Sequence, residues 1–302
     1  MGKIYSAVDI GSNTIHQLTA EVDRDSIHEI ADNKEWLGLG EVVARSGEIP
    51  SALQDRVVET LLNYRSAARV AESDGWYVFA TEAVRRAKNS AALLKRIRRQ
   101  VGVEVEIVNG DREADLAVAG AMLDCELEGE VTLADVGGGS AQIATVKNGR
   151  ATSVNSVPLG TGTLSAKFSI EGPSDPTSVR AIAKYARKTL AEDAAPKYAE
   201  ALIASGGVAR GIWKALHPDG DRTICLPELD YLIWAGENLS VEGLSARFQV
   251  RGKRASTLLP GAIVFREMMR IVGVESMQVS RFGVREGAIL RLASGKIEPC
   301  PL

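Results

Sequence analysis

The segment VDIGSNT, residues 8–14, joins two apolar stretches and decides how the first half of the chain folds. Residues 4–10 (IYSAVDI) are typical of a buried strand, and residues 15–22 of a second one. Gly11-Ser12-Asn13 between them has the composition of a tight turn. The sequence therefore predicts two strands joined by a turn of small polar residues, with Asp9 near the end of the first strand.

The same pattern returns at residues 131–147. VTLADV predicts a strand that closes near an acid, Asp135, and Gly137-Gly138-Gly139-Ser140 predicts a turn into another strand. Two matched segments indicate an internal duplication, and a repeat of this size predicts two like domains that face each other.

The other elements fit an α/β protein with the domains 1–124 and 125–302. The boundary falls at the polar stretch 124–129, and a mostly helical insertion is expected at about 226–272. Further strands are predicted at 27–31, 76–80, 103–108, 150–157, 201–204 and 276–280, and helices at 51–73, 82–100, 111–123, 161–169, 176–193, 207–216 and 284–293.

Composition narrows the class of protein. The chain has 302 residues, 45% hydrophobic and 25% charged, with a net charge of -3, which argues against a nucleic-acid binder held by bulk basicity. The distant cysteines Cys125, Cys225 and Cys300 make a disulfide framework or structural zinc unexpected. Neither a signal peptide nor a membrane-spanning run is evident, so a cytoplasmic protein without membrane partners is expected.

The two turns are the first candidate site. Glycine permits the close approach that a backbone nest around phosphate needs. Side-chain donors are added by Ser12, Asn13, Thr14 and Ser140. Asp9 and Asp135 are placed where a metal ion or an attacking water could be held. One such turn alone is equally typical of a plain hairpin, whereas the matched pair favours phosphate binding.

Three further strand-to-helix junctions carry candidate residues. In ATEAVRRAKN (80–89), Arg85 or Arg86 could clamp a phosphate bidentately, although a solvated basic helix face has the same composition. In NGDREA (109–114), Glu113 could deprotonate a water, or could simply favour the helix dipole. Ser205-Gly206-Gly207 is a third junction suited to a phosphate or nucleotide.

Taken in order, these segments resemble the exopolyphosphatase and guanosine pentaphosphate phosphohydrolase family. This family belongs to the superfamily of actin, sugar kinases and heat-shock chaperone ATPases. The resemblance covers nearly the whole chain and implies two ribonuclease-H-like, or actin-like ATPase, domains around an interdomain cleft. The matching segments are VDIGSNT (8–14), ATEAVRRAKN (80–89), NGDREA (109–114), ADVGGGS (134–140), PLGTGTL (158–164), ASGGVAR (204–210), RASTLLPGA (254–262) and REG (285–287).

The resemblance implies a role for several of the residues. Glu113 matches the general base, Asp135 the acid near the metal ion and the attacking water, and Arg85 a phosphate-binding arginine. A divalent cation, Mg²⁺ or another, is expected at Asp9, Asp135 and residue 142. The phosphate loops are matched by Gly11, Ser12, Asn13, Gly138, Gly139 and Ser140.

One difference from the family's sequence pattern bears on the choice between a hydrolase and a sensor. Relatives carry Glu two residues after the GGGS serine position, where this chain has Gln142. The hydrolase interpretation gives polyphosphate as the substrate, with guanosine pentaphosphate second, and reduced activity. The rival is a sensor that binds these ligands without efficient hydrolysis, and a sugar or acid kinase is a third alternative. For each of these three functions, a homodimer is among the expected assemblies.

Overall fold

A computed structural model describes residues 2–23, 26–126, 129–170, 173–194 and 199–302. Its internal contacts divide the chain into two compact units. Unit 1 comprises Met1–Leu123 and Phe282–Leu302, and unit 2 comprises Asp124–Arg281. Of the polar stretch 124–129, residues 127 and 128 lie outside the described residues.

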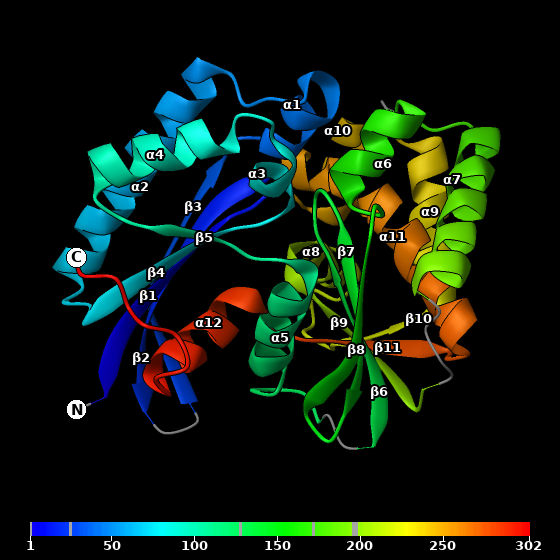
Figure 1. The fold of residues 1–302 in the computed structure, drawn as a ribbon. Helices are drawn as coiled ribbons and strands as arrows, with labels where there is room; N and C mark the ends of the chain where they lie inside the picture. The colour runs from blue at the N-terminus through cyan, green and yellow to red at the C-terminus, as the bar shows by residue number, and fades with distance from the viewer. Residues whose placement is uncertain (1, 24–25, 127–128, 171–172, 195–198) are drawn as a thin grey trace. The chain divides into compact units, whose positions relative to one another are not determined.

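Unit 1 is built on a mixed sheet with the order β3-β2-β1-β4-β5 (Figure 1). β1 pairs antiparallel with β2 and parallel with β4, so it has a hydrogen-bonded neighbour along each of its edges. Successive side chains of a strand point to opposite faces, and Trp76 and Val78 accordingly enter one core while Tyr77 and Phe79 enter the other. The strands are β1 (Lys3–Ile10), β2 (Thr14–Asp23), β3 (Ser26–Trp36), β4 (Gly75–Ala80) and β5 (Val105–Ile107).

Helices cover both faces of this sheet. The helices are α1 (Leu39–Ser46), α2 (Ser51–Val70), α3 (Glu82–Arg86), α4 (Ser90–Val101), α5 (Gly110–Ala121) and α12 (Val284–Ala293). The last of these returns from the end of the chain and packs against α5 and β1. Contact with α5 is close, because a Cβ added to Gly120 would lie 2.1 Å from the carbonyl oxygen of Gly283, and one added to Gly287 would lie 1.9 Å from that of Leu116.

Unit 2 repeats the strand order of unit 1. Its sheet runs β10-β11-β9-β6-β7-β8, so β8, β7, β6, β9 and β11 follow one another as β3, β2, β1, β4 and β5 do, with β10 added at an edge. The duplication expected from the two glycine turns is thus also present in the topology. The strands are β6 (Glu130–Val136), β7 (Ala141–Lys147), β8 (Arg150–Val157), β9 (Ala201–Ser205), β10 (Thr223–Cys225) and β11 (Ser276–Val279).

The helices of unit 2 share one large core with its sheet. α11 is central, since it contacts α6, α7, α8, α9 and α10. The helices are α6 (Thr161–Phe168), α7 (Pro176–Thr189), the π-helical turn η1 (Leu190–Ala194), α8 (Gly206–Leu216), α9 (Leu226–Asn238), α10 (Val241–Phe248) and α11 (Gly252–Val272). The helical stretch expected at 226–272 corresponds to α9, α10 and α11.

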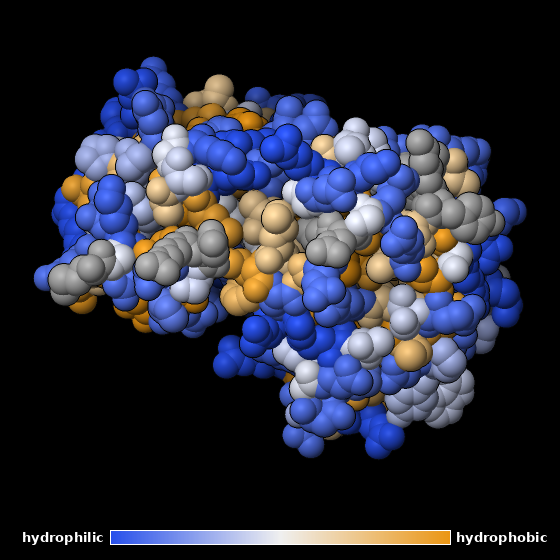
Figure 2. Space-filling view, turned by 90° about the horizontal axis from the view of Figure 1, so that it is seen from below, coloured by the Kyte–Doolittle hydropathy of each residue, from blue (hydrophilic) through white to orange (hydrophobic). Residues whose placement is uncertain are grey.

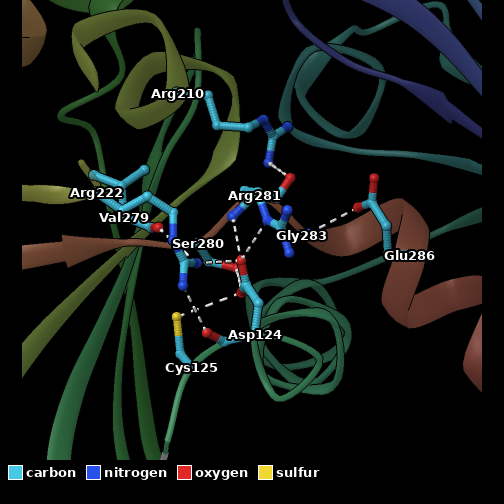
Figure 3. Close-up of polar contacts among 9 residues, drawn as sticks. All are labelled: Asp124, Cys125, Arg210, Arg222, Val279, Ser280, Arg281, Gly283 and Glu286. Atoms are coloured by element: carbon cyan, nitrogen blue, oxygen red, sulfur yellow. Dashed lines mark hydrogen bonds and ion pairs between the residues drawn. The ribbon is translucent and has the colours of Figure 1, made fainter. Parts of the chain in front are cut away.

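A buried carboxylate ties the first residue of unit 2 to its last residues (Figure 3). Asp124 accepts hydrogen bonds from the Ser280 hydroxyl at 2.7 Å and from the Arg281 backbone N–H at 3.0 Å. The guanidinium of Arg222 pairs with the same carboxylate. The two places where the chain enters and leaves unit 2 are therefore held together by one side chain.

Some elements differ from those expected. The helix predicted at 82–100 is interrupted at residues 87–89, where the Asn89 side chain accepts from Ile49 N–H at 3.0 Å and donates to Ile49 C=O at 2.9 Å. The Lys88 N–H donates to Gly47 C=O at 2.9 Å instead of to a carbonyl of the preceding helical turn, so the helix is broken here. The helix α1 and the short strand β10 were not expected. Unit 2 begins at Asp124 and ends at Arg281, and residues 282–302 belong to unit 1.

The surface gives no sign of a membrane-spanning element in the described part of the chain. No helix there is both long and apolar enough to cross a bilayer. The face drawn in Figure 2 is mostly hydrophilic, with hydrophobic residues scattered among the charged ones.

Candidate phosphate-binding and catalytic residues

The turn of unit 1 is held by backbone hydrogen bonds. Gly11 N–H donates to Thr14 C=O at 2.9 Å across the turn. The Ser12 carbonyl accepts from Gly40 N–H at 2.8 Å, and the Asn13 carbonyl accepts from Gly38 N–H at 3.0 Å. Since these carbonyl oxygens are engaged within the protein, the turn has a fixed shape and presents less negative potential to an anion.

The turn of unit 2 has the same internal bond. Gly137 N–H donates to Ser140 C=O at 2.9 Å, the same distance as in unit 1. The Gly137 carbonyl accepts from Thr161 N–H at 2.9 Å, and the Gly138 carbonyl from Gly162 N–H at 2.8 Å. The two turns are thus alike in hydrogen bonding as well as in sequence.

A second repeated sequence supports both turns, and sequence reasoning missed it. Leu37-Gly38-Leu39-Gly40 follows β3, and Leu159-Gly160-Thr161-Gly162 follows β8. A Cβ on Gly160 would lie 2.3 Å from the Gly139 carbonyl carbon, and a Cβ on Gly40 would lie 2.7 Å from the Ser12 Cβ. Glycine is required where these segments press on the turns. The recurrence of LGxG after the third strand of each half was the available signal.

Each turn has an acidic residue beside it. In unit 1, both carboxylate oxygens of Asp9 lie 3.7 Å from where a Gly11 Cβ would be. In unit 2, Asp135 is nearly buried, and a Cβ on Gly206 would lie 2.1 Å from its Oδ1. Gly206 also has φ of 87°, so glycine is required here both by the backbone conformation and by the closeness of Asp135. Ser205, which caps α8 beside it, is fully buried.

Opposite Asp9 in the β1–β2 register lies His16. Its ring contacts Asp32 and the Arg285 guanidinium, whose Nη1 is 2.9 Å from Nε2. Burial lowers the pKa of His16 to about 4, outweighing the opposing effect of the hydrogen bond that the Asp32 carboxylate accepts. The neutral ring is therefore the form that the fold selects near neutral pH.

The structure brings together two of the expected residues on different helices. Glu113, in the first turn of α5, is 13% exposed, and its Oε2 lies 3.9 Å from Nη1 of Arg85 on α3. Arg85 also bonds the Glu82 carboxylate and the Val108 carbonyl, each at 2.5 Å. Arg85 can thus orient Glu113, but some of its donors are already engaged. Arg86, 51% exposed, has a looser contact with Glu82 at 3.6 Å.

Gln142 is buried at the base of the unit 2 turn, opposite Asp135 in the β6–β7 register. Its amide nitrogen donates to the Ser140 hydroxyl at 2.8 Å and to the Ser156 hydroxyl at 3.3 Å. Its amide N–H groups are therefore used, and only its carbonyl oxygen could be offered to a cation.

Arg254 is a candidate that sequence reasoning missed. It lies on α11, and its guanidinium donates to the Gly207 carbonyl at the start of α8. Burial, and then the charge of Arg210, lower the pKa of this guanidinium. A cation thus lies beside the Gly206-Gly207 turn in unit 2. Its segment, RASTLLPGA at 254–262, was among those that match the family, but no local pattern marked the arginine as a ligand-binding residue.

No preformed metal cage is present in the described residues, since none of their His, Cys, Asp and Glu side chains gather in groups of three or more. Mg²⁺ usually binds proteins through one or two carboxylates and completes its shell with water and substrate phosphates. The carboxylates of Asp9 and Asp135, each beside a glycine turn, fit that mode of binding.

Two like α/β sheets, each with an acidic strand end and a glycine turn, define the class of actin-like ATPase folds. The chain belongs to the Ppx/GppA phosphatase family, whose model matches residues 18–295. Exopolyphosphatase 1 of Mycobacterium tuberculosis is 29% identical over 309 residues, which cover 94% of this chain and 86% of that protein. A guanosine-5'-triphosphate,3'-diphosphate pyrophosphatase of Aeromonas hydrophila is 24% identical and is covered over 59% of its length.

Solved structures agree on the fold. The Aquifex aeolicus member of the Ppx/GppA family superposes with a TM-score of 0.85 at 24% identity, covering 97% of this chain and 98% of that one. An exopolyphosphatase from Cytophaga hutchinsonii superposes with a TM-score of 0.86 at 20% identity, with 97% and 98% covered. The family and the fold class expected from the sequence are confirmed.

Proposed function

We propose that this protein removes the terminal phosphate from inorganic polyphosphate, with guanosine pentaphosphate as the second substrate. The observation that carries the proposal is the matched pair of turns, each closed by the same 2.9 Å backbone bond and each beside a carboxylate, in a member of the Ppx/GppA phosphatase family. The names of the relatives, exopolyphosphatase and guanosine pentaphosphate pyrophosphatase, support the same substrate class.

Glu113 is the proposed general base. Its carboxylate takes a proton from water while the water oxygen attacks the terminal phosphorus in line, and the bond from that phosphorus to the bridging oxygen breaks. Arg85, 3.9 Å away, holds the carboxylate in position and has further N–H groups for a phosphate oxygen. The products are inorganic phosphate and a chain shorter by one unit.

The turns are the proposed phosphate-binding elements. Backbone N–H groups and the hydroxyls of Ser12, Thr14 and Ser140 donate to phosphate oxygens, and the Gly206-Gly207 turn does the same with Arg254 beside it. Asp9 in unit 1 and Asp135 in unit 2 are each proposed as a carboxylate ligand for Mg²⁺, a cation that would neutralise charge on the phosphate oxygens.

A sensor is the second candidate function, and the Gln142 contacts favour it. A buried amide that is already bonded to two hydroxyls stabilises the turn without adding the charge that a cation needs. Such a site would keep its phosphate ligands and lose turnover.

The deciding experiment measures phosphate release from long-chain polyphosphate and from guanosine pentaphosphate, in Mg²⁺ and in EDTA. We expect release from polyphosphate that requires the cation. Tight binding of either ligand without release would favour the sensor, and neither binding nor release would refute both functions.

A further inference from the structure

A cavity of about 460 Å³ lies in unit 2 between α7, α9 and α11, which run side by side in Figure 1. Its volume is in the range of small-molecule sites. None of the glycine-turn residues or acids assigned above to hydrolysis lines it. The lining residues that carry charge are Arg180, Lys184, Arg187, Arg266 and Arg270, against Asp230 and Glu237.

The cationic side chains are arranged by helix geometry. Arg180, Lys184 and Arg187 are spaced i, i+4 and i+7 on α7, so they share one face of that helix. The described residues offer neither Arg180 nor Lys184 an ion-pair partner, and Arg180 only donates to the Thr177 hydroxyl at 3.2 Å. Two exposed cations at the cavity are therefore available to an anion.

The inner wall of the cavity is fixed by a buried carboxylate. Glu267 is fully buried and pairs with Arg187 at 2.8 Å, Arg266 at 3.0 Å and Arg270 at 3.3 Å. A single carboxylate cannot neutralise three guanidinium groups. Asp230 offsets only part of the remaining positive charge, through its ion pair with Arg266 at 3.0 Å. The arginines are thus pre-positioned with excess positive charge, as anion-binding sites require.

An aromatic surface adjoins these charges. Trp234 on α9 lines the cavity and is 56% exposed, and its ring stacks on that of Tyr231 with centroids 5.9 Å apart. A large exposed indole braced by a second ring is a platform on which a planar group can stack, and such stacking tolerates any nucleobase.

We propose that this cavity is a nucleotide-binding site separate from the hydrolytic residues. The base stacks on Trp234 and the phosphates bind Arg180 and Lys184, with Arg187 behind them. An inorganic phosphate chain would use the cations but would leave the indole without a partner, so the site selects a nucleoside polyphosphate. The proposal does not depend on the hydrolytic function, because the cavity shares no residue with it.

The test uses the quenching of tryptophan fluorescence by ATP in EDTA, which prevents turnover. In the unaltered protein we expect saturable quenching. Trp234→Phe should abolish that signal while Trp36, Trp76 and Trp213 still emit. Arg180→Ala/Lys184→Ala should raise the ATP concentration for half-saturation about tenfold or more, as expected for the loss of charge-assisted bonds.

Controls separate this site from general electrostatics and from the hydrolytic site. Lys188→Ala removes an α7 cation that pairs instead with Glu192, and it should bind ATP as the unaltered protein does. Tripolyphosphate should displace ATP at least tenfold less well than ADP does. The proposal is overturned if the double variant keeps its affinity, if quenching persists in Trp234→Phe, or if tripolyphosphate competes as well as ADP. Polyphosphate hydrolysis by the double variant is measured separately and should not change.

Discussion

Replacing Gln142 by Glu tests the difference between an enzyme and a sensor. Gln142 is 1% exposed, and its amide nitrogen donates to the hydroxyls of Ser140 and Ser156. The two side chains have nearly equal volume, and both hydroxyls can rotate to donate to a carboxylate. The substitution therefore adds one negative charge without removing either contact.

The effect of the added charge on the free energy of unfolding can be estimated. Two hydrogen bonds to a charged group contribute about 1.5–3 kcal/mol each, against a desolvation penalty of several kcal/mol. Asp135 is the cross-strand neighbour, and cross-strand Cβ atoms lie about 5 Å apart. Two like charges at that separation repel by about 3 kcal/mol at an effective dielectric constant of 20. Without a divalent cation the variant should thus be less stable by a few kcal/mol, and a cation bound by both carboxylates should offset this loss.

We accordingly expect Gln142→Glu to raise the rate of phosphate release and to lower the Mg²⁺ concentration for half-maximal activity. Its melting temperature should rise with Mg²⁺ more steeply than that of the unaltered protein. Gln17→Glu is the matched control, because Gln17 is also a fully buried strand residue but has different surroundings. It should lose stability without any Mg²⁺ rescue.

The reasoning is refuted if phosphate release by Gln142→Glu is unchanged or reduced at every Mg²⁺ concentration. That result would mean that the turn has been rebuilt around the amide, and that the added carboxylate repels the phosphates of the substrate.

Three further predictions, two of them with a control variant, concern other parts of the protein. Gly206→Ala should lower activity at least tenfold, because the added Cβ displaces the Asp135 carboxylate. In the control Gly220→Ala, at φ of 97° with open space around it, only folding stability should fall, by about 1–2 kcal/mol for a non-glycine residue in a left-handed conformation. Equal activities of the two variants would contradict this. Arg85→Ala should weaken polyphosphate binding by about 1.5–3 kcal/mol, and Arg98→Ala, 72% exposed, far less; equal losses would indicate general electrostatics. Because the pKa of His16 falls from 6.5 to about 4 on folding, its contribution to stability is present above pH 6.5 and is lost toward pH 4; urea unfolding of His16→Gln should lack this slope.

The local pattern of the sequence was enough to predict most strands and both turns. Apolar runs that end in an acid and small residues constrain the backbone directly, so 4–10 and 131–136 were expected close to where β1 and β6 lie. The assignment of 282–302 to unit 1 could not be predicted in this way. It depends on the approach of Gly120 to Gly283, a contact between segments far apart in the chain.

In the candidate site, too, some features follow from the local sequence and others depend on tertiary packing. The glycines of the turns follow from backbone geometry, which a sequence reveals. The contacts of Arg85 with Val108 and Glu113 do not, because they join α3 to a segment more than twenty residues further along the chain. The position of Arg254 beside Gly207 could not be predicted either, since it is created by the packing of α11 on α8.

The most direct test of the proposed hydrolysis compares the unaltered protein with Glu113→Gln in one assay, phosphate release from long-chain polyphosphate with Mg²⁺, alongside polyphosphate binding. The substitution keeps the shape of the side chain and removes its ability to take a proton. The account predicts release by the unaltered protein, a loss of about 10²-fold or more in the variant, the usual scale for a general base, and nearly equal binding by the two. Release by Glu113→Gln at close to the unaltered rate would contradict it.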